Sequence, residues 1–347
     1  MLRVPRTRFG ALTAALATLL AATLLLAAPS SAAAVDVAAV DVAATEGAAT
    51  DEFATDAFAT VVLPPPTSSL TEVHDFGPNP TGLLMHLYVP TAVKPHPAVL
   101  VVLHYCTGSG PAMFTGTQFA SLADRDGFIV IYPSAPRDGH CFDVSSPGAL
   151  VHDGNSDPVG IVSMIRYVQQ RLHADRSRVS VTGISSGAMM TNVLLGDYPD
   201  VFQAGAAMSG VPFGCFATTD GSMWNSTCAD GNLIKTPQEW GDQVRAAFPT
   251  YHGPRPRMQV WHGTADTILF SPNFGEQVKQ WTNVLRTRHS RTDQPQPNWT
   301  HTQYLDRSGR VAVDAYSVEG ASHNLGFDVP EWAQLAVRFF GLTQRRI

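Results

Sequence analysis

Short apolar runs alternate along most of the chain with longer segments in which apolar residues recur at helical spacing. The predicted strands are 98–103, 128–132, 179–182, 204–208 and 258–261, followed by a hairpin of 300–304 and 311–316. The predicted helices are 117–123, 159–172, 276–285 and 331–340. This alternation predicts an α/β fold, a mostly parallel central sheet with helices on both faces, whose sites lie at the carboxyl ends of the strands.

Residues 1–34 have the three parts of a secretory signal peptide. Arg3, Arg6 and Arg8 precede an apolar run from about residue 11 to residue 28, and small residues follow. The run is barely long enough to span a bilayer and ends in residues that suit cleavage, so we expect a cleaved signal rather than a membrane anchor. The mature protein is therefore predicted to be extracellular, with no stable membrane association.

Residues 35–64 are rich in Ala, Asp, Thr and Pro and contain few large apolar side chains. This composition predicts a low-complexity leader or linker. Residues 65–347 are then long enough for a single α/β domain with an ample core, which would carry all of the chemistry.

The formal charge is −6, and it becomes −9 once the three arginines leave with the signal peptide. Lys and Arg are scattered, so nucleic acid is not expected as a partner. No His-Glu-x-x-His or Cys-x-x-Cys spacing is present, and neither a metal nor a cofactor is predicted. The sequence leaves the oligomeric state open, with a monomer expected.

The four cysteines form an even set in a chain predicted to be exported, so disulfides are expected rather than reactive thiols. Three pairings are possible. We favour Cys215 with Cys228, which would close a short loop. We favour Cys106 with Cys141 because both follow predicted strands on the same side of the sheet.

The segment 183–187 (GISSG) lies between a predicted strand and a helix-forming run. Gly-x-Ser-x-Gly alone is a weak signal, but in this setting it is typical of a nucleophile elbow, in which glycines relieve the crowding of a sharp turn. Ser185 is therefore the candidate nucleophile. A Gly- and Ser-rich connection without chemistry is the alternative.

A serine nucleophile needs a base, and the base needs a carboxylate that holds its tautomer. In hydrolases that have a nucleophile elbow, the nucleophile, the acid and the base follow in that order along the chain. Asp266, just after the strand 258–261, is the candidate acid, and His323, in the loop after the last strands, is the candidate base. The alternatives are Asp314 and Glu319 for the acid, and His262, His289 and His301 for the base.

Two backbone amides must also stabilise the oxyanion of the intermediate. Ser186, which follows the nucleophile, is expected to supply one. The other is expected from the loop 104–110, with Cys106 preferred and Thr107 next. This loop lacks the third glycine and the Lys-Ser/Thr ending of a phosphate-binding loop.

Four segments carry a family resemblance: HYCTG at 104–108, GISSGAMMTN at 183–192, WNSTC at 224–228 and HGTADT at 262–267. Together they resemble the secreted polyhydroxybutyrate-depolymerase-like esterases of carbohydrate esterase family 1, over nearly all of residues 65–347. The resemblance is closest to the acetylxylan esterases, with feruloyl esterases next, and Tyr105 favours this polysaccharide branch. It implies an α/β-hydrolase fold with Ser185, Asp266 and His323 as its triad.

The resemblance therefore implies a secreted serine ester hydrolase that deacetylates xylan without a cofactor, its partner being a polysaccharide or polyester substrate. The enzymatic alternatives are feruloyl esterase and polyhydroxybutyrate depolymerase activity. The non-enzymatic alternative is an inactive carbohydrate-binding protein of the same fold. Tyr105, Trp224 and Trp281 are candidate aromatics for binding the sugar.

Overall fold

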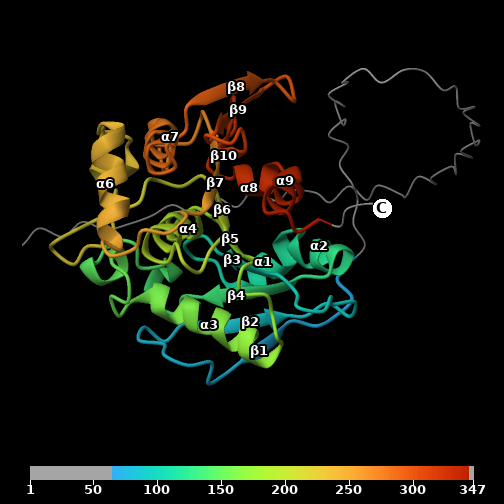
Figure 1. The fold of residues 1–347 in the computed structure, drawn as a ribbon. Helices are drawn as coiled ribbons and strands as arrows, with labels where there is room; N and C mark the ends of the chain where they lie inside the picture. Colours follow the sequence, from blue (N-terminus) through green and yellow to red (C-terminus); the bar gives the residue numbers. More distant parts are fainter. Residues whose placement is uncertain (1–64, 344–347) are drawn as a thin grey trace, which may run out of the picture. The chain divides into compact units, whose positions relative to one another are not determined.

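The computed structural model describes residues 65–343, so the predicted signal peptide (1–34) and linker (35–64) lie outside the described residues. The described part contains one sheet with the strand order β1-β2-β4-β3-β5-β6-β7-β10-β9-β8 (Figure 1). Its strands are β1 Thr71–Val73, β2 Leu84–Tyr88, β3 Val99–Leu103, β4 Ile129–Ser134, β5 Val179–Ile184, β6 Ala204–Met208, β7 Arg257–Gly263, β8 His289–Asp293, β9 Trp299–Leu305 and β10 Val311–Val318.

The centre of this sheet is parallel and its two edges are antiparallel. Strands β4, β3, β5, β6, β7 and β10 run in one direction. The edge strands β1 and β2 pair antiparallel on one side, and β9 and β8 do so on the other. The predicted α/β class and mostly parallel sheet are confirmed.

Helices cover both faces of the sheet, which explains the uninterrupted apolar runs. In β3, Val99 and Val101 belong to the core on one face, and Leu100 and Val102 belong to the core on the other. The first face packs against α3 (Asp157–Arg171), α4 (Ser186–Asp197) and α7 (Pro272–Val284), and α6 (Pro237–Ala247) packs on α4 and α7. The second packs against α1 (Gly110–Gly116), α2 (Phe119–Asp126) and α9 (Glu331–Phe339) (Figure 1). Two short helices, α5 (Ser226–Ala229) and α8 (Leu325–Asp328), lie in loops.

The hydrophobic pattern does not predict β1, β2, β8 or α6. All residues of β8 are exposed, so no apolar alternation marks it, and it forms through its ladder with β9. Helix α6 buries Trp240 and Val244 in an otherwise polar sequence. The sequence feature that indicates this helix is a capping box, in which the side chains of Thr236 and Glu239 each accept a hydrogen bond from the other residue's backbone amide.

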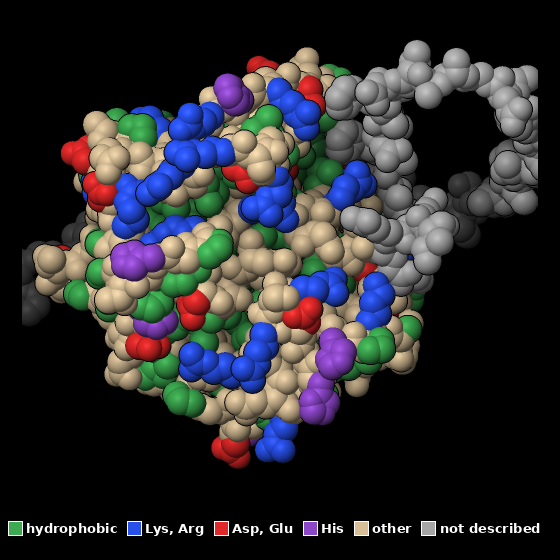
Figure 2. Space-filling model, viewed as in Figure 1, with side chains coloured by type: hydrophobic (Ala, Val, Ile, Leu, Met, Phe, Trp, Pro, Cys, Tyr) green, Lys and Arg blue, Asp and Glu red, His purple; other side chains and the backbone are tan. Residues whose placement is uncertain are grey.

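Basic and acidic side chains are both spread over the face shown in Figure 2. Within residues 65–343, no helix has the length and hydropathy that a bilayer crossing requires. Because β3, β5, β7 and β10 are parallel, their carboxyl ends meet at one edge of the sheet. The loops that leave them carry Cys106, Ser185, Asp266 and His323.

Candidate active site

The turn between β5 and α4 has the geometry of a nucleophile elbow. Ser185 lies at φ +56° and ψ −116°, a positive φ that non-glycine residues rarely adopt. A Cβ on Gly187 would lie 2.4 Å from the carbonyl oxygen of Leu103, and a Cβ on Gly183 would lie 2.4 Å from the carbonyl carbon of Gly187. Both positions therefore require glycine, because the backbone of the turn packs against itself and against β3.

His323 reaches the nucleophile from the loop after β10. Its Nε2 lies 2.9 Å from Ser185 Oγ, and its Nδ1 lies 2.8 Å from Asp266 Oδ2. Since the carboxylate accepts a hydrogen bond from Nδ1–H, Nε2 carries no proton and is free to accept the proton of Ser185. The structure thus brings together the three residues that the sequence analysis selected.

Asp266 is buried and fully hydrogen-bonded. Its Oδ1 accepts the amides of Ile268 (2.9 Å) and Leu269 (3.0 Å). Burial alone would raise the pKa of this carboxyl, but hydrogen bonds from His262 and His323 outweigh it and hold the pKa well below its usual value. Asp266 therefore remains an anion that can stabilise a charged imidazole.

His262 contacts the acid rather than the nucleophile. Its Nε2 lies 2.7 Å from the carbonyl oxygen of Leu269 and 3.2 Å from Asp266 Oδ2. The sequence analysis kept His262 only as an alternative base, although it stands four residues before Asp266. That same spacing of four residues, across a tight turn, is the signal that could have marked it as a second partner of the acid.

Of the alternatives, the acid Asp314 and the base His301 belong to a separate network. Asp314 Oδ1 lies 2.7 Å from His301 Nε2, and His301 Nδ1 lies 2.8 Å from Asp293. The remaining alternative base, His289, is exposed at the start of β8. None of these contacts involves Ser185.

The candidate oxyanion donors differ in what already binds their amides. The Thr107 amide donates to the carbonyl of Gly139 (2.8 Å), which removes Thr107 from the alternatives. Within residues 65–343, the amides of Cys106 and Ser186 have no such acceptor. Both remain available to a bound oxyanion.

His104 holds the loop 104–110 in place but carries no proton chemistry. Its Nδ1–H donates to the carbonyl of Tyr105 (2.7 Å), and its Nε2 accepts the amide of Ala135 (3.0 Å). Burial lowers the pKa of His104 to about 4, so the ring stays neutral. A neutral ring with both nitrogens bonded has a structural role.

The disulfides are Cys106–Cys141 and Cys215–Cys228, the pairing that the sequence analysis favoured. The second closes the loop that carries Trp224. That tryptophan is 49% exposed and stands edge-on to Phe216.

The other two aromatic candidates differ in exposure. Tyr105 is half-buried and meets Phe327 edge-on, so part of it still faces solvent. Trp281 is wrong as a sugar-binding residue, because it is wholly buried in α7 and its indole N–H donates to Asn192 Oδ1 (2.6 Å). Its helical spacing places it against α4 and not at the surface.

Comparison with known proteins gives a consistent set of similarities. The family described as "Esterase PHB depolymerase" matches residues 83–231, which include the loop 104–110 and the elbow. Acetylxylan esterase A of Aspergillus oryzae is 44% identical over 286 residues, which cover 80% of this chain and 90% of that protein. Feruloyl esterase B of Talaromyces stipitatus is 43% identical over 281 residues, covering 80% and 76%.

Among solved structures, the acetyl xylan esterase from Aspergillus awamori matches with a TM-score of 0.75 at 39% identity. The match covers 80% of this chain and 100% of that one. Proteins named for two different ester substrates are thus similar to this chain to nearly the same extent.

Proposed function

Since the chain belongs to the esterase family of the polyhydroxybutyrate depolymerases, together with fungal acetylxylan and feruloyl esterases, we propose that it is a secreted serine esterase that deacetylates xylan. The observation that carries the proposal is the unbroken chain of contacts from Ser185 through His323 to Asp266. A nucleophile, a base and an orienting acid in this order are the groups that ester hydrolysis requires.

In the acylation half, His323 Nε2 takes the proton of Ser185 as the serine oxygen bonds to the carbonyl carbon of the acetyl ester. The charge that develops on the carbonyl oxygen is stabilised by the amides of Ser186 and Cys106. Asp266 accepts a hydrogen bond from the Nδ1–H group throughout and stabilises the imidazolium. Collapse of the intermediate breaks the ester C–O bond, and His323 protonates the departing sugar oxygen, which leaves as a hydroxyl.

In the deacylation half, a water molecule takes the position of the sugar hydroxyl. His323 Nε2 removes its proton while the water oxygen bonds to the acyl carbon. The same two amides stabilise the second oxyanion. Its collapse returns the proton to Ser185 and releases acetate, so no cofactor takes part.

A fluorophosphonate probe tests the mechanism directly, because it labels only an activated serine. We expect one label on the wild-type protein and none on Ser185→Ala. The rate of p-nitrophenyl acetate hydrolysis by Ser185→Ala should fall to about 10³-fold above the rate in water. A wild-type protein that stays unlabelled would instead support the inactive carbohydrate-binding alternative.

The acyl group and polymer require a substrate panel. Acetylated xylan, methyl ferulate and polyhydroxybutyrate should be compared at equal enzyme concentration, with release of acetate, ferulate and hydroxybutyrate as the readouts. We expect acetate release to be fastest, in keeping with the acetylxylan esterases among the relatives. Faster release of ferulate would favour the feruloyl esterase alternative instead.

We also propose that residues 1–34 direct export and that 35–64 link the mature terminus to the catalytic domain 65–347. Two disulfides support this, because such bonds persist in oxidising compartments. Sequencing the N-terminus of the secreted protein tests it, and a protein retained with an intact Met1 would contradict it.

A further inference from the structure

A third segment contacts both halves of the proposed oxyanion hole. We name residues 135–142, which follow β4, the bracing segment. On one side it meets the loop 104–108: Cys141 is disulfide-bonded to Cys106, and the carbonyl of Gly139 accepts the amide of Thr107 at 2.8 Å. The loop that carries the Cys106 amide is therefore attached to the bracing segment covalently and by hydrogen bonding.

On its other side the bracing segment meets the nucleophile elbow. The amide of Phe142 donates to Ser186 Oγ at 2.8 Å, and both residues are buried. The Phe142 ring also packs on the His104 ring, with centroids 4.5 Å apart. A short path thus joins the two donors: Cys106, the disulfide, Cys141, the Phe142 amide and the Ser186 hydroxyl.

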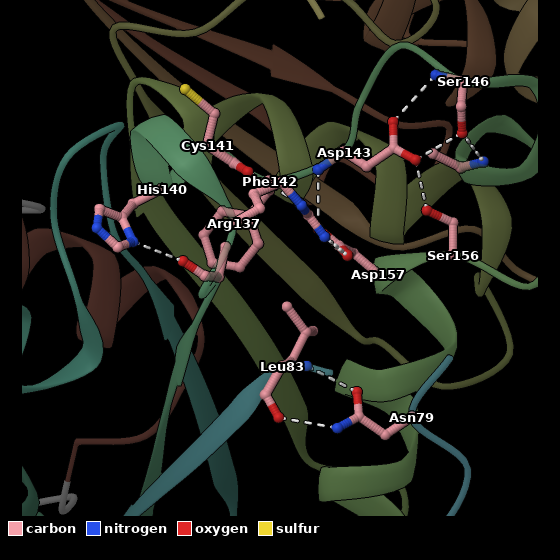
Figure 3. Close-up of polar contacts among 12 residues, drawn as sticks. Asn79, Leu83, Arg137, His140, Cys141, Phe142, Asp143, Ser146, Ser156 and Asp157 are labelled. Carbon is pink, nitrogen blue, oxygen red and sulfur yellow. Dashed lines mark hydrogen bonds and ion pairs between the residues drawn. The ribbon is translucent and has the colours of Figure 1, made fainter. Parts of the chain in front are cut away.

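The bracing segment is itself anchored to the core. Arg137 donates to the carbonyl of Cys141 (2.8 Å) and forms a two-point ion pair with Asp157, which is fully buried at the start of α3 (Figure 3). Asp157 Oδ2 also accepts the amide of Asp143 (2.8 Å), just beyond the segment. These contacts leave the segment little freedom to follow a moving loop.

We propose that the bracing segment sets the separation of the two oxyanion donors, with the hydroxyl of Ser186 as a positioning group distinct from the catalytic amide of the same residue. This rests on the proposed function. Oxyanion donors act within a narrow range of distance, about 2.7–3.1 Å from the oxyanion, so a small shift of one amide lowers transition-state binding. Substrate binding in the ground state depends far less on that distance.

The test is Ser186→Ala, which removes the acceptor of the Phe142 amide and keeps the backbone donor. With p-nitrophenyl acetate as the probe, we expect kcat to fall about tenfold, part of the 10²–10³-fold cost of losing a donor outright. KM should change less than about twofold, and the rate of fluorophosphonate labelling should fall in parallel with kcat. Ser186→Thr, which retains a hydroxyl, should recover part of the loss.

Ser180→Ala is the matched control. Ser180 is also a buried serine, and its hydroxyl accepts a hydrogen bond from Gln203 Nε2 at 3.2 Å, at the end of β5 that lies away from the elbow. It should lose a similar amount of thermal stability but keep kcat within about twofold. Equal kcat losses in the two variants, or a Ser186→Ala kcat within twofold of wild type, would overturn the proposal.

Removal of the disulfide gives a second, independent arm. If the disulfide and the Ser186 hydroxyl both act through the bracing segment, Cys106→Ala/Cys141→Ala should lower kcat, and adding Ser186→Ala should lower kcat little further. Losses in kcat that multiply would contradict this shared action. An inactive, unlabelled wild-type protein would refute the proposed function itself, whereas an active wild type with an unaffected Ser186→Ala would refute only the inference.

Discussion

Replacement of Asp266 by Asn tests the assignment of the acid with little change of shape. The Oδ1 position accepts the amides of Ile268 and Leu269, so the carboxamide oxygen of Asn must occupy it. The NH₂ group then takes the Oδ2 position, 2.8 Å from His323 Nδ1. Because NH₂ cannot accept a hydrogen bond, His323 must move its proton to Nε2, the nitrogen that faces Ser185.

A ring protonated at Nε2 cannot take the proton of Ser185, and the negative charge that stabilises the imidazolium is lost as well. We therefore expect kcat of Asp266→Asn to fall about 10⁴-fold, which corresponds to about 5.5 kcal/mol of transition-state stabilisation. The contact of His262 with the carbonyl of Leu269 at 2.7 Å is untouched, so the turn should keep its conformation.

The assay is steady-state hydrolysis of p-nitrophenyl acetate at pH 7, with circular dichroism to verify folding. Asp314→Asn is the matched control, since Asp314 is also a buried carboxylate bonded to a histidine, at 2.7 Å from His301 Nε2. Its kcat should stay within about twofold of wild type. A folded Asp266→Asn protein that keeps more than a tenth of wild-type kcat would refute the reasoning.

Three further predictions concern stability. Burial lowers the pKa of His301, but hydrogen bonds to Asp314 and Asp293 outweigh burial, and the pKa is raised in the folded state. The charged His301 therefore stabilises the fold fully below about pH 6.5, and this stabilisation is lost as the pH rises through the raised pKa. Melting temperatures of wild type and His301→Gln should therefore converge as pH rises above 6.5, and parallel curves would contradict this. Asn192→Leu leaves the buried Trp281 N–H and a Gln277 oxygen without hydrogen-bond partners. The free energy of unfolding, measured in urea, should fall by about 2–5 kcal/mol, and a fall below about 1 kcal/mol would contradict a role of these hydrogen bonds in stability. Gly187→Ala places a Cβ 2.4 Å from the carbonyl oxygen of Leu103. It should lower the free energy of unfolding by about 1–3 kcal/mol and remove most esterase activity. Full activity would instead show that β3 moves to make room for the methyl group.

The local parts of the site could be read from the chain alone. A strand, a Gly-x-Ser-x-Gly turn and a helix follow one another within a short stretch, and the two glycines mark a sharp turn that has no room for larger side chains. The order nucleophile, acid, base then limited the partners of Ser185 to a few residues. Burial on both faces likewise made the central strands visible as apolar runs.

Other features depended on which distant residues meet across the sheet. Sequence left several histidines open as the base, and the ladder of β7 with β10 brings His323 to Asp266 while His301 meets Asp314 on the adjoining strands. The burial of Trp281 and the engagement of the Thr107 amide are likewise set by packing between remote elements. A one-residue slip in a ladder moves a side chain to the opposite face, so contacts of this kind follow from three-dimensional register and not from composition or local spacing.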